Sequence, residues 1–135
     1  MSNLGTEPIG DDEILLRRVP ETRQWYYETS GLSPHAFEPR KDDDTGLSVV
    51  REKHCPIEVA ATGPSRQGYF VARLRAGDLR KRGIEVCPRP IPDILGHAEI
   101  TSLTFQDRDS DRSQEIMVQL ATELCLDVHG PFHAS

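Results

Sequence analysis

The sequence lacks several features that would place it in a functional class at once. Its three cysteines are an odd number with spacings that fit no disulfide framework, and the absence of a Cys-x-x-Cys pair argues against a structural zinc site. It has no Gly-rich phosphate loop, and the acidic run 42–44 lacks the alternate spacing of a calcium loop. No apolar run approaches the length that spans a bilayer, and the first residues contain no secretory h-region. We therefore expect a cytoplasmic protein without a metal or membrane contact.

Positive charge is also in short supply. The formal net charge is −6, which argues against a protein that coats nucleic acid, because such a role needs excess cations. The charge is nevertheless uneven. Residues Arg73–Arg89 hold six basic and two acidic side chains, a local charge of +4. Selective binding of structured RNA through this segment remains an open alternative, with strong salt dependence as its signature.

The length of 135 residues fits one domain with a single core. We expect a disordered lead-in over 1–10, one folded domain over 11–128 and a frayed tail over 129–135. The predicted fold is α+β: a mostly antiparallel sheet of about five strands, covered by a C-terminal helix and one or two short helices.

Hydrophobic periodicity predicts most elements. The expected strands are Glu13–Val19, Leu47–Glu52, Tyr69–Leu74, Ile84–Val86 and His97–Thr101, with short strand pieces at Gln24–Glu28 and His35–Glu38. The second strand is expected to pair with the chain before the turn 41–46. The prolines at 88, 90 and 92 predict an extended, unpaired connection. The expected helices are Pro56–Ala61, Ala76–Arg82 and Arg112–Leu124, the last with Asp111 as its N-cap.

The predicted core combines the apolar faces of these elements. It draws on Leu15 or Leu16, Val49 or Val50, Phe70, Ala72, Leu74, Leu79, Ile84, Ile100, Ile116, Leu120 and Leu124.

Two polar residues on the last predicted strand are the first candidates for chemistry. His97 and Glu99 are two residues apart, so their side chains point to the same face of a strand. An imidazole and a carboxylate on one face can orient a polar substrate or share proton transfer. The alternative is a polar sheet face that meets only water.

Arginine on the first strand and serine on the second are the next candidates. Arg17 or Arg18 lies among leucines, so it must find an anion or reach solvent. Ser48 lies in the middle of the second strand. The order Arg, Ser48, Glu99 along the chain resembles the Arg–Ser–Glu layout of ADP-ribosyltransferase-like enzymes, although His97 stands where those enzymes carry Glu or Gln. The resemblance implies that the arginine and serine hold NAD and that Glu99 supports transfer of ADP-ribose.

The leading hypothesis from sequence is a non-catalytic accessory or regulatory protein that binds a protein partner. The predicted contact residues are the aromatic group Trp25, Tyr26 and Tyr27 with the basic residues Arg73, Arg80, Lys81 and Arg82. The small NAD- or nucleotide-handling enzyme is the alternative to it.

Two further patterns bear on metal and thiol chemistry. Cys125, His129 and His133 are spaced four residues apart, but Gly130 and Pro131 interrupt any helix that would align them. Cys55 and Cys87 show no local sign of activation.

The phrases LLRRVP, SPHAFEPR, GLSVVRE, GYFVA, GDLRKRGIEV and PDILGHAEI, over Glu13–Leu103, resemble a group of small uncharacterised bacterial proteins. That resemblance implies a bacterial cytosolic protein and carries no activity.

Overall fold

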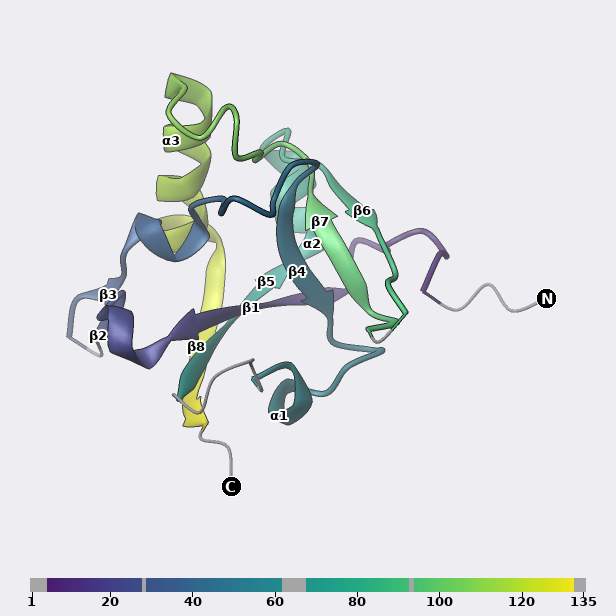
Figure 1. Cartoon of the computed structure of the whole chain (residues 1–135), viewed down its shortest axis with the longest axis horizontal. Coiled ribbons are helices and arrows are strands. Elements are labelled where there is room, and N and C mark those ends of the chain that lie inside the picture. Colours follow the sequence, from purple (N-terminus) through teal and green to yellow (C-terminus); the bar gives the residue numbers. More distant parts are fainter. Residues whose placement is uncertain (1–4, 28, 62–67, 93, 133–135) are drawn as a thin grey trace.

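The computed structural model describes residues 5–27, 29–61, 68–92 and 94–132. Its centre is a six-stranded antiparallel sheet in the order β6-β7-β4-β1-β5-β8 (Figure 1). The strands are β1 Ile14–Pro20, β4 Leu47–Arg51, β5 Tyr69–Arg75, β6 Val86–Pro88, β7 His97–Ile100 and β8 Cys125–Phe132. A separate two-stranded hairpin pairs β2 Tyr26–Tyr27 with β3 Gly31–Leu32.

The helices are short except at the C-terminal end. They are α1 Ile57–Ala60, α2 Ala76–Lys81 and α3 Asp111–Gln119, which continues into one π-helical turn over Leu120–Leu124. Two 3-10 turns, η1 Glu21–Arg23 and η2 Pro34–Phe37, follow β1 and β3. Within the described part of the chain, no helix has both the length and the apolar content needed to cross a membrane.

Both faces of the sheet are covered near its middle, one by a large hydrophobic core and the other by a small cluster. The main core lies between one face and α2, α3 and η2, and includes Leu15, Leu74 and Ile116, all fully buried. A small second cluster on the other face packs Leu16 and Val71 against α1. Beyond α1, this second face is open over β4 and β7, and polar side chains occupy it.

The predicted fold class is confirmed, with six strands rather than about five. The strands that begin near residues 13, 47, 69 and 97 lie within two residues of their predicted bounds, and the alternation of apolar residues explains this. The three predicted helices also form. Gly83 ends α2 with a φ of +73°, as a left-handed terminal residue should.

The predicted tail and lead-in are wrong for the residues that the structure describes. His129 to Phe132 belong to β8, which pairs with β5 along the sheet edge. At the other end, Ile9 is buried and the Gly5 carbonyl accepts a hydrogen bond from Arg51. Alternating hydrophobicity could not reveal β8, because its outward residues are polar on an edge strand.

Three local elements differ from their predicted form or position. The strand expected at Ile84–Val86 forms two residues later, and its last residue, Pro88, tolerates the sheet edge because edge strands do not need every N–H. The piece expected at His35–Glu38 is the 3-10 turn η2, so β4 pairs instead with β1 and β7. The N-cap of α3 is Ser110, not Asp111.

Candidate functional site

Three neighbouring strands place polar residues in one row across the open face. Ser48 of β4 and Glu99 of β7 are cross-strand partners. On β1, Leu16 pairs with Val50 of β4, and Arg18, two residues further, lies on the same face of β1 as Leu16. The guanidinium carbon of Arg18 lies 5.3 Å from the centroid of the Tyr69 ring on β5. Directly opposed residues point to the same face of a sheet, so Arg18, Ser48 and Glu99 face the same side.

The Ser48 hydroxyl lies between the side chains of His97 and Asp43. Its Oγ is 3.1 Å from His97 Nε2 and 3.2 Å from Asp43 Oδ1. His97 Nδ1 lies 2.8 Å from the Arg89 carbonyl oxygen, which can only accept, so Nδ1 carries the proton. The single hydroxyl hydrogen of Ser48 is donated to Asp43 Oδ1, and the hydrogen bond to the Arg89 carbonyl fixes the orientation of the His97 ring beside the Ser48 oxygen.

Glu99 is held as firmly as Ser48. Its Oε1 accepts a hydrogen bond of 2.7 Å from the Thr45 hydroxyl and lies 3.4 Å from Arg89 Nε. Thr45 comes from the turn before β4, which approaches β7 closely at Gly46. A side-chain carbon at Gly46 would lie 2.9 Å from Glu99 Cβ, so glycine is required for this approach.

Arg17, the neighbouring candidate, points to the main core. Its Nε donates to the Ala36 carbonyl at 3.0 Å, and a terminal nitrogen donates to the Ser48 carbonyl at 2.9 Å. Burial lowers the pKa of Arg17 to about 10, partly offset by the charge of Asp43. Arg17 thus joins η2 to β4 beneath the site, and Arg18 is the arginine on its face.

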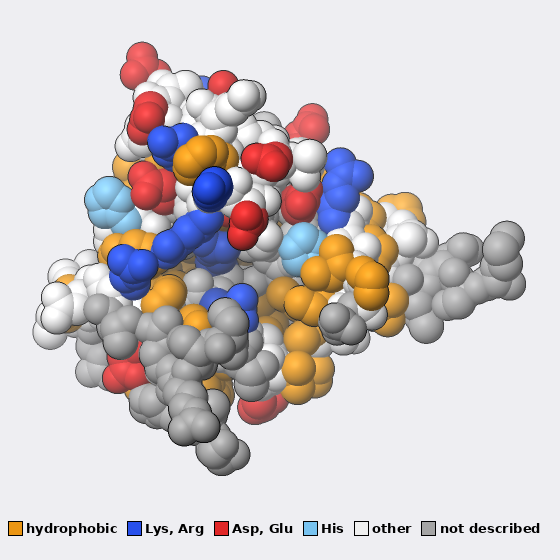
Figure 2. Space-filling view, viewed as in Figure 1, with side chains coloured by type: hydrophobic (Ala, Val, Ile, Leu, Met, Phe, Trp, Pro, Cys, Tyr) orange, Lys and Arg blue, Asp and Glu red, His pale blue; other side chains and the backbone are white. Residues whose placement is uncertain are grey.

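The space-filling view shows the result on the surface. Basic, acidic and histidine side chains gather over the middle of β1, β4 and β7, in the face that is turned to the viewer in Figure 2. Sequence analysis found Ser48, His97 and Glu99 in this group but missed Asp43, Thr45 and Arg89. The sequence KDDDTG at residues 41–46 predicts only a turn, but two of its side chains, Asp43 and Thr45, belong to this group.

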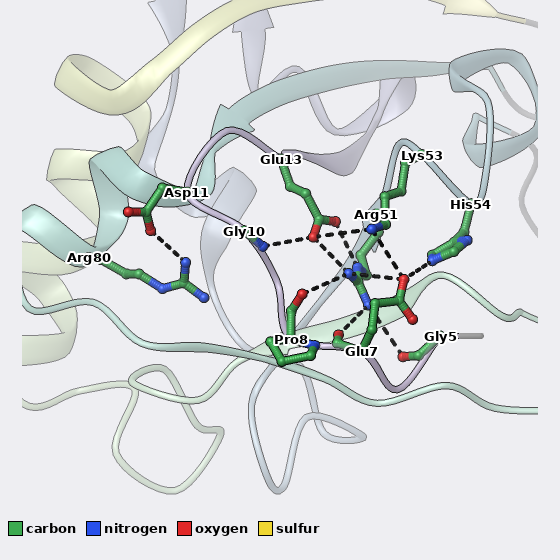
Figure 3. Close-up of polar contacts among 10 residues, drawn as sticks. All are labelled: Gly5, Glu7, Pro8, Gly10, Asp11, Glu13, Arg51, Lys53, His54 and Arg80. Carbon is green, nitrogen blue, oxygen red and sulfur yellow. Dashed lines mark hydrogen bonds and ion pairs between the residues drawn. The ribbon is translucent and has the colours of Figure 1, made fainter. Parts of the chain in front are cut away.

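A second polar cluster surrounds Arg51, which is completely buried (Figure 3). Its guanidinium donates to both carboxylate oxygens of Glu13 and to carbonyl oxygens of Gly5, Glu7 and Pro8. Because its donors are used within the protein, Arg51 anchors the N-terminal segment and is not available to a ligand.

Glu7 completes this cluster. Its Oε1 lies 2.5 Å from His54 Nε2 and 3.2 Å from Lys53 Nζ. The hydrogen bond with His54, above all, lowers the pKa of Glu7 to about 2. A surface hollow of about 650 Å³ lies alongside, lined by Pro8, Gly10, Asp11, Asp12, Glu13, Ile14, Glu52 and Lys53.

The residues predicted to bind a protein partner do not form one surface. Figure 1 shows β2 at one end of the molecule and α2 behind the sheet. Trp25 and Tyr26 pack partly against the core, and only Tyr27 is half exposed. The basic residues have acidic neighbours: Arg73 pairs with Glu52 and Asp127, Arg80 with Asp11, and Arg82 with Glu123. Lys81 is exposed on α2.

Cys55 and Cys125 are not activated as nucleophiles. Burial raises the pKa of the thiols of Cys55 and Cys125, which lowers their thiolate fraction at neutral pH. Among the described residues, no group of three or more His, Cys, Asp and Glu could hold a metal ion. His133, the third member of the predicted trio, lies outside the described residues.

Comparisons of the chain with protein-family profiles, with curated proteins and with solved structures found no match. The fold and site together define an α+β protein with an antiparallel sheet, one face of which carries a fixed polar row.

Proposed function

We propose that the chain is a small nucleotide-handling enzyme with an ADP-ribosyltransferase-like site, in which Arg18, Ser48 and Glu99 act on NAD. The observation that supports this most is the row itself. The layout along the sequence did not require β1, β4 and β7 to be adjacent, nor Ser48 and Glu99 to be direct partners. Three residues that are far apart in the chain therefore share one side of one sheet, as a common ligand site requires.

In this proposal each residue has a distinct part. Arg18 and Ser48 hold NAD, the arginine through its charge and the serine through its hydroxyl. Glu99 stabilises positive charge at C1′ of the ribose as its bond to the nicotinamide nitrogen breaks. The bonding electron pair leaves with nicotinamide, which becomes neutral. The acceptor forms the new bond to C1′ and gives its proton to Glu99.

The fixed position of Glu99 suits the stabilisation of positive charge at C1′. Its carboxylate is bound on one oxygen by Thr45 and Arg89, so it is oriented before a ligand arrives. Preorganised charge costs no rearrangement at the moment of reaction, which is why such carboxylates are effective. Arg17 holds the strand beneath Ser48 and so positions it without touching the ligand.

The test combines binding with turnover. Saturating NAD at a hundredfold excess over its Kd should stabilise the protein by about 2.7 kcal/mol in a thermal shift. Incubation with NAD should release nicotinamide, measured by chromatography. Glu99→Gln should keep the shift and lose release, whereas Ser48→Ala should reduce the shift. The matched control is Glu85→Gln, an exposed acid on the loop before β6.

The proposal fails if neither NAD nor other nucleotides shift the melting temperature and no nicotinamide appears. It also fails if Glu99→Gln and Glu85→Gln release nicotinamide at the rate of the unaltered protein.

A non-catalytic protein that binds a partner remains the second candidate. It is supported by the exposed apolar residues Ile91, Ile94 and Leu95 in the connection between β6 and β7, and by Tyr27. The internal ion pairs of Arg73, Arg80 and Arg82 reduce the free charge available to it. If it holds, Trp25→Ala weakens capture of the partner from cell extract without unfolding the domain; unchanged capture counts against it.

A further inference from the structure

Four arginines of the described residues lie over aromatic rings, and two of them, Arg23 and Arg40, share the ring of Trp25. The guanidinium carbons of Arg23 and Arg40 lie 5.8 and 4.9 Å from the centroid of the Trp25 ring. Both arginines are exposed, and within the described part of the chain neither forms an ion pair with a carboxylate. By contrast Arg73, Arg75, Arg80, Arg82, Arg89 and Arg112 each have an acidic partner.

A second aromatic side chain shares this surface. Tyr26 and Tyr27 are consecutive residues of β2, so they point to opposite sides of the β2–β3 hairpin. Trp25 directly precedes β2, and the same alternation puts it on the side of Tyr27, although part of its ring also packs against the main core. Tyr26 packs against Phe70, with ring centroids 4.9 Å apart, which confirms its inward direction. Tyr27 is 50% exposed. The hairpin is held in place by a 2.7 Å hydrogen bond from the Ser33 amide to the Trp25 carbonyl.

The charge beneath this surface is also positive. Burial lowers the pKa of Arg17, and the nearby charges of Arg40 and Arg18 lower it further, while Asp43 opposes them. Arg17 therefore lies within electrostatic range of Asp43, Arg40 and Arg18. Arg40 and Arg18 each repel Arg17, and an anion bound near them would offset that repulsion in the way that Asp43 does.

We propose that Arg23, Trp25, Tyr27 and Arg40 form a platform for a short stretch of single-stranded nucleic acid. The guanidinium groups bind phosphates, and bases stack on Tyr27 and on the arginine planes that cover Trp25. Proteins that bind single-stranded nucleic acid combine aromatic side chains, on which the bases stack, with cationic side chains that bind the phosphates. Trp25 and Tyr27 are about 7 Å apart along the strand, so neighbouring bases each reach a ring.

This site is separate from the NAD site and does not depend on it. A phosphorylated peptide offers phosphate but no flat base for Tyr27. A duplex keeps its bases stacked inside, so its backbone would gain only the charge contacts. Single strands offer both groups at once, and the interleaving of cations and aromatics therefore favours them.

Trp25 is the only tryptophan in the chain, so its fluorescence reports on the platform directly. Addition of oligo-dT or oligo-U of 12 nucleotides should quench that fluorescence. Binding, followed by the anisotropy of a labelled oligonucleotide, should weaken with salt, with a slope of about −0.7 per phosphate contact. Arg23→Ala and Arg40→Ala should each make the slope shallower by about 0.7. Tyr27→Leu should weaken binding by roughly tenfold, in line with the loss of one stacked base.

The matched control is Arg82→Ala, which removes an exposed arginine of α2 and should leave affinity and slope unchanged. Circular dichroism and the urea midpoint establish that each variant is folded. The proposal is overturned if the platform variants and the control bind alike. It is equally overturned if a duplex or a phosphorylated peptide binds more tightly than the single strand. Displacement of the oligonucleotide by NAD at the Kd of NAD would assign the platform to NAD and overturn it too.

Discussion

Arg51 of β4 and Glu13, immediately before β1, form an ion pair with two hydrogen bonds of 2.8 and 2.7 Å, and the arginine is wholly buried. Arg51 lies on the face of β4 that carries the core residues Leu47 and Val49, so its charge is buried among apolar side chains. The pair explains its position. The guanidinium also donates hydrogen bonds to the carbonyl oxygens of Gly5, Glu7 and Pro8, and these bonds hold the N-terminal segment against the sheet.

Removal of one partner from this pair should be costly, because the other charge stays buried without compensation. We expect Arg51→Ala to lower the free energy of unfolding by about 3–5 kcal/mol. Urea unfolding followed by circular dichroism measures the loss. Arg112→Ala serves as the control, since its pair with Glu115 is exposed on α3 and should contribute about 0.5 kcal/mol or less. Equal losses in the two variants would show that Arg51 is not an anchor.

Glu7 should make stability depend on pH in the acid range. Its pKa in the folded protein is about 2, against an ordinary value of 4.5, chiefly because of its hydrogen bond with His54. A depressed folded pKa gives stability that is complete above about 4.5 and is lost as the pH falls toward 2. Glu7→Gln should therefore lose less stability than the unaltered protein between these pH values, as measured by urea midpoints.

Glu13 contributes in the same direction, so the variant should flatten the acid slope only in part. Burial acts to raise the pKa of Glu13, but the hydrogen bond from Arg51 and that from the Gly10 amide outweigh it. An acid slope identical in Glu7→Gln and the unaltered protein would contradict the assignment of Glu7.

The sequence predicted the centre of the fold better than its edges, for a physical reason. β1, β4, β5 and β7 bury one face at least, so their apolar residues alternate. β8 is an edge strand with Leu126, Asp127 and His129 exposed, so it carries no such pattern. Backbone hydrogen bonds to β5 determine the position of β8, and the types of residue in β8 do not predict such bonds.

The candidate site likewise has a part that the sequence predicts and a part that only the structure shows. The shared face of His97 and Glu99 follows from the two-residue period of a strand, which sequence gives directly. The adjacency of β1, β4 and β7 is a matter of long-range pairing, and Thr45 reaches Glu99 across a sequence separation of 54 residues. Trp25 illustrates the converse: the sequence predicts it as a contact for a protein partner, yet Arg23 and Arg40 lie over its ring.

Gly46 should be needed for the geometry of Glu99. A side-chain carbon there would lie 2.9 Å from both Glu99 Cβ and the Ile100 carbonyl oxygen, and the backbone oxygen cannot move aside easily. We expect Gly46→Ala to cost about 1–3 kcal/mol of unfolding free energy and to displace Glu99, which reduces nicotinamide release if the proposed activity is present. Gly10→Ala is the control, because nothing lies within 4 Å of the added carbon. Stability of Gly46→Ala equal to that control would contradict the close approach.

The start of α3 offers a test that separates two neighbouring residues. The Ser110 hydroxyl accepts a 3.1 Å hydrogen bond from the Ser113 amide, which is one of the N–H groups that a helix leaves unpaired in its first turn. We expect Ser110→Ala to lower the free energy of unfolding by about 1 kcal/mol. Asp111→Ala should cost about 0.3–1 kcal/mol, because Asp111 acts only through its charge near the positive helix end. Salt distinguishes the two effects: about 1 M NaCl should remove most of the Asp111 loss and leave the Ser110 loss in place, since a hydrogen bond at short range is not screened. A larger loss for Asp111→Ala at high salt would return the capping role to Asp111.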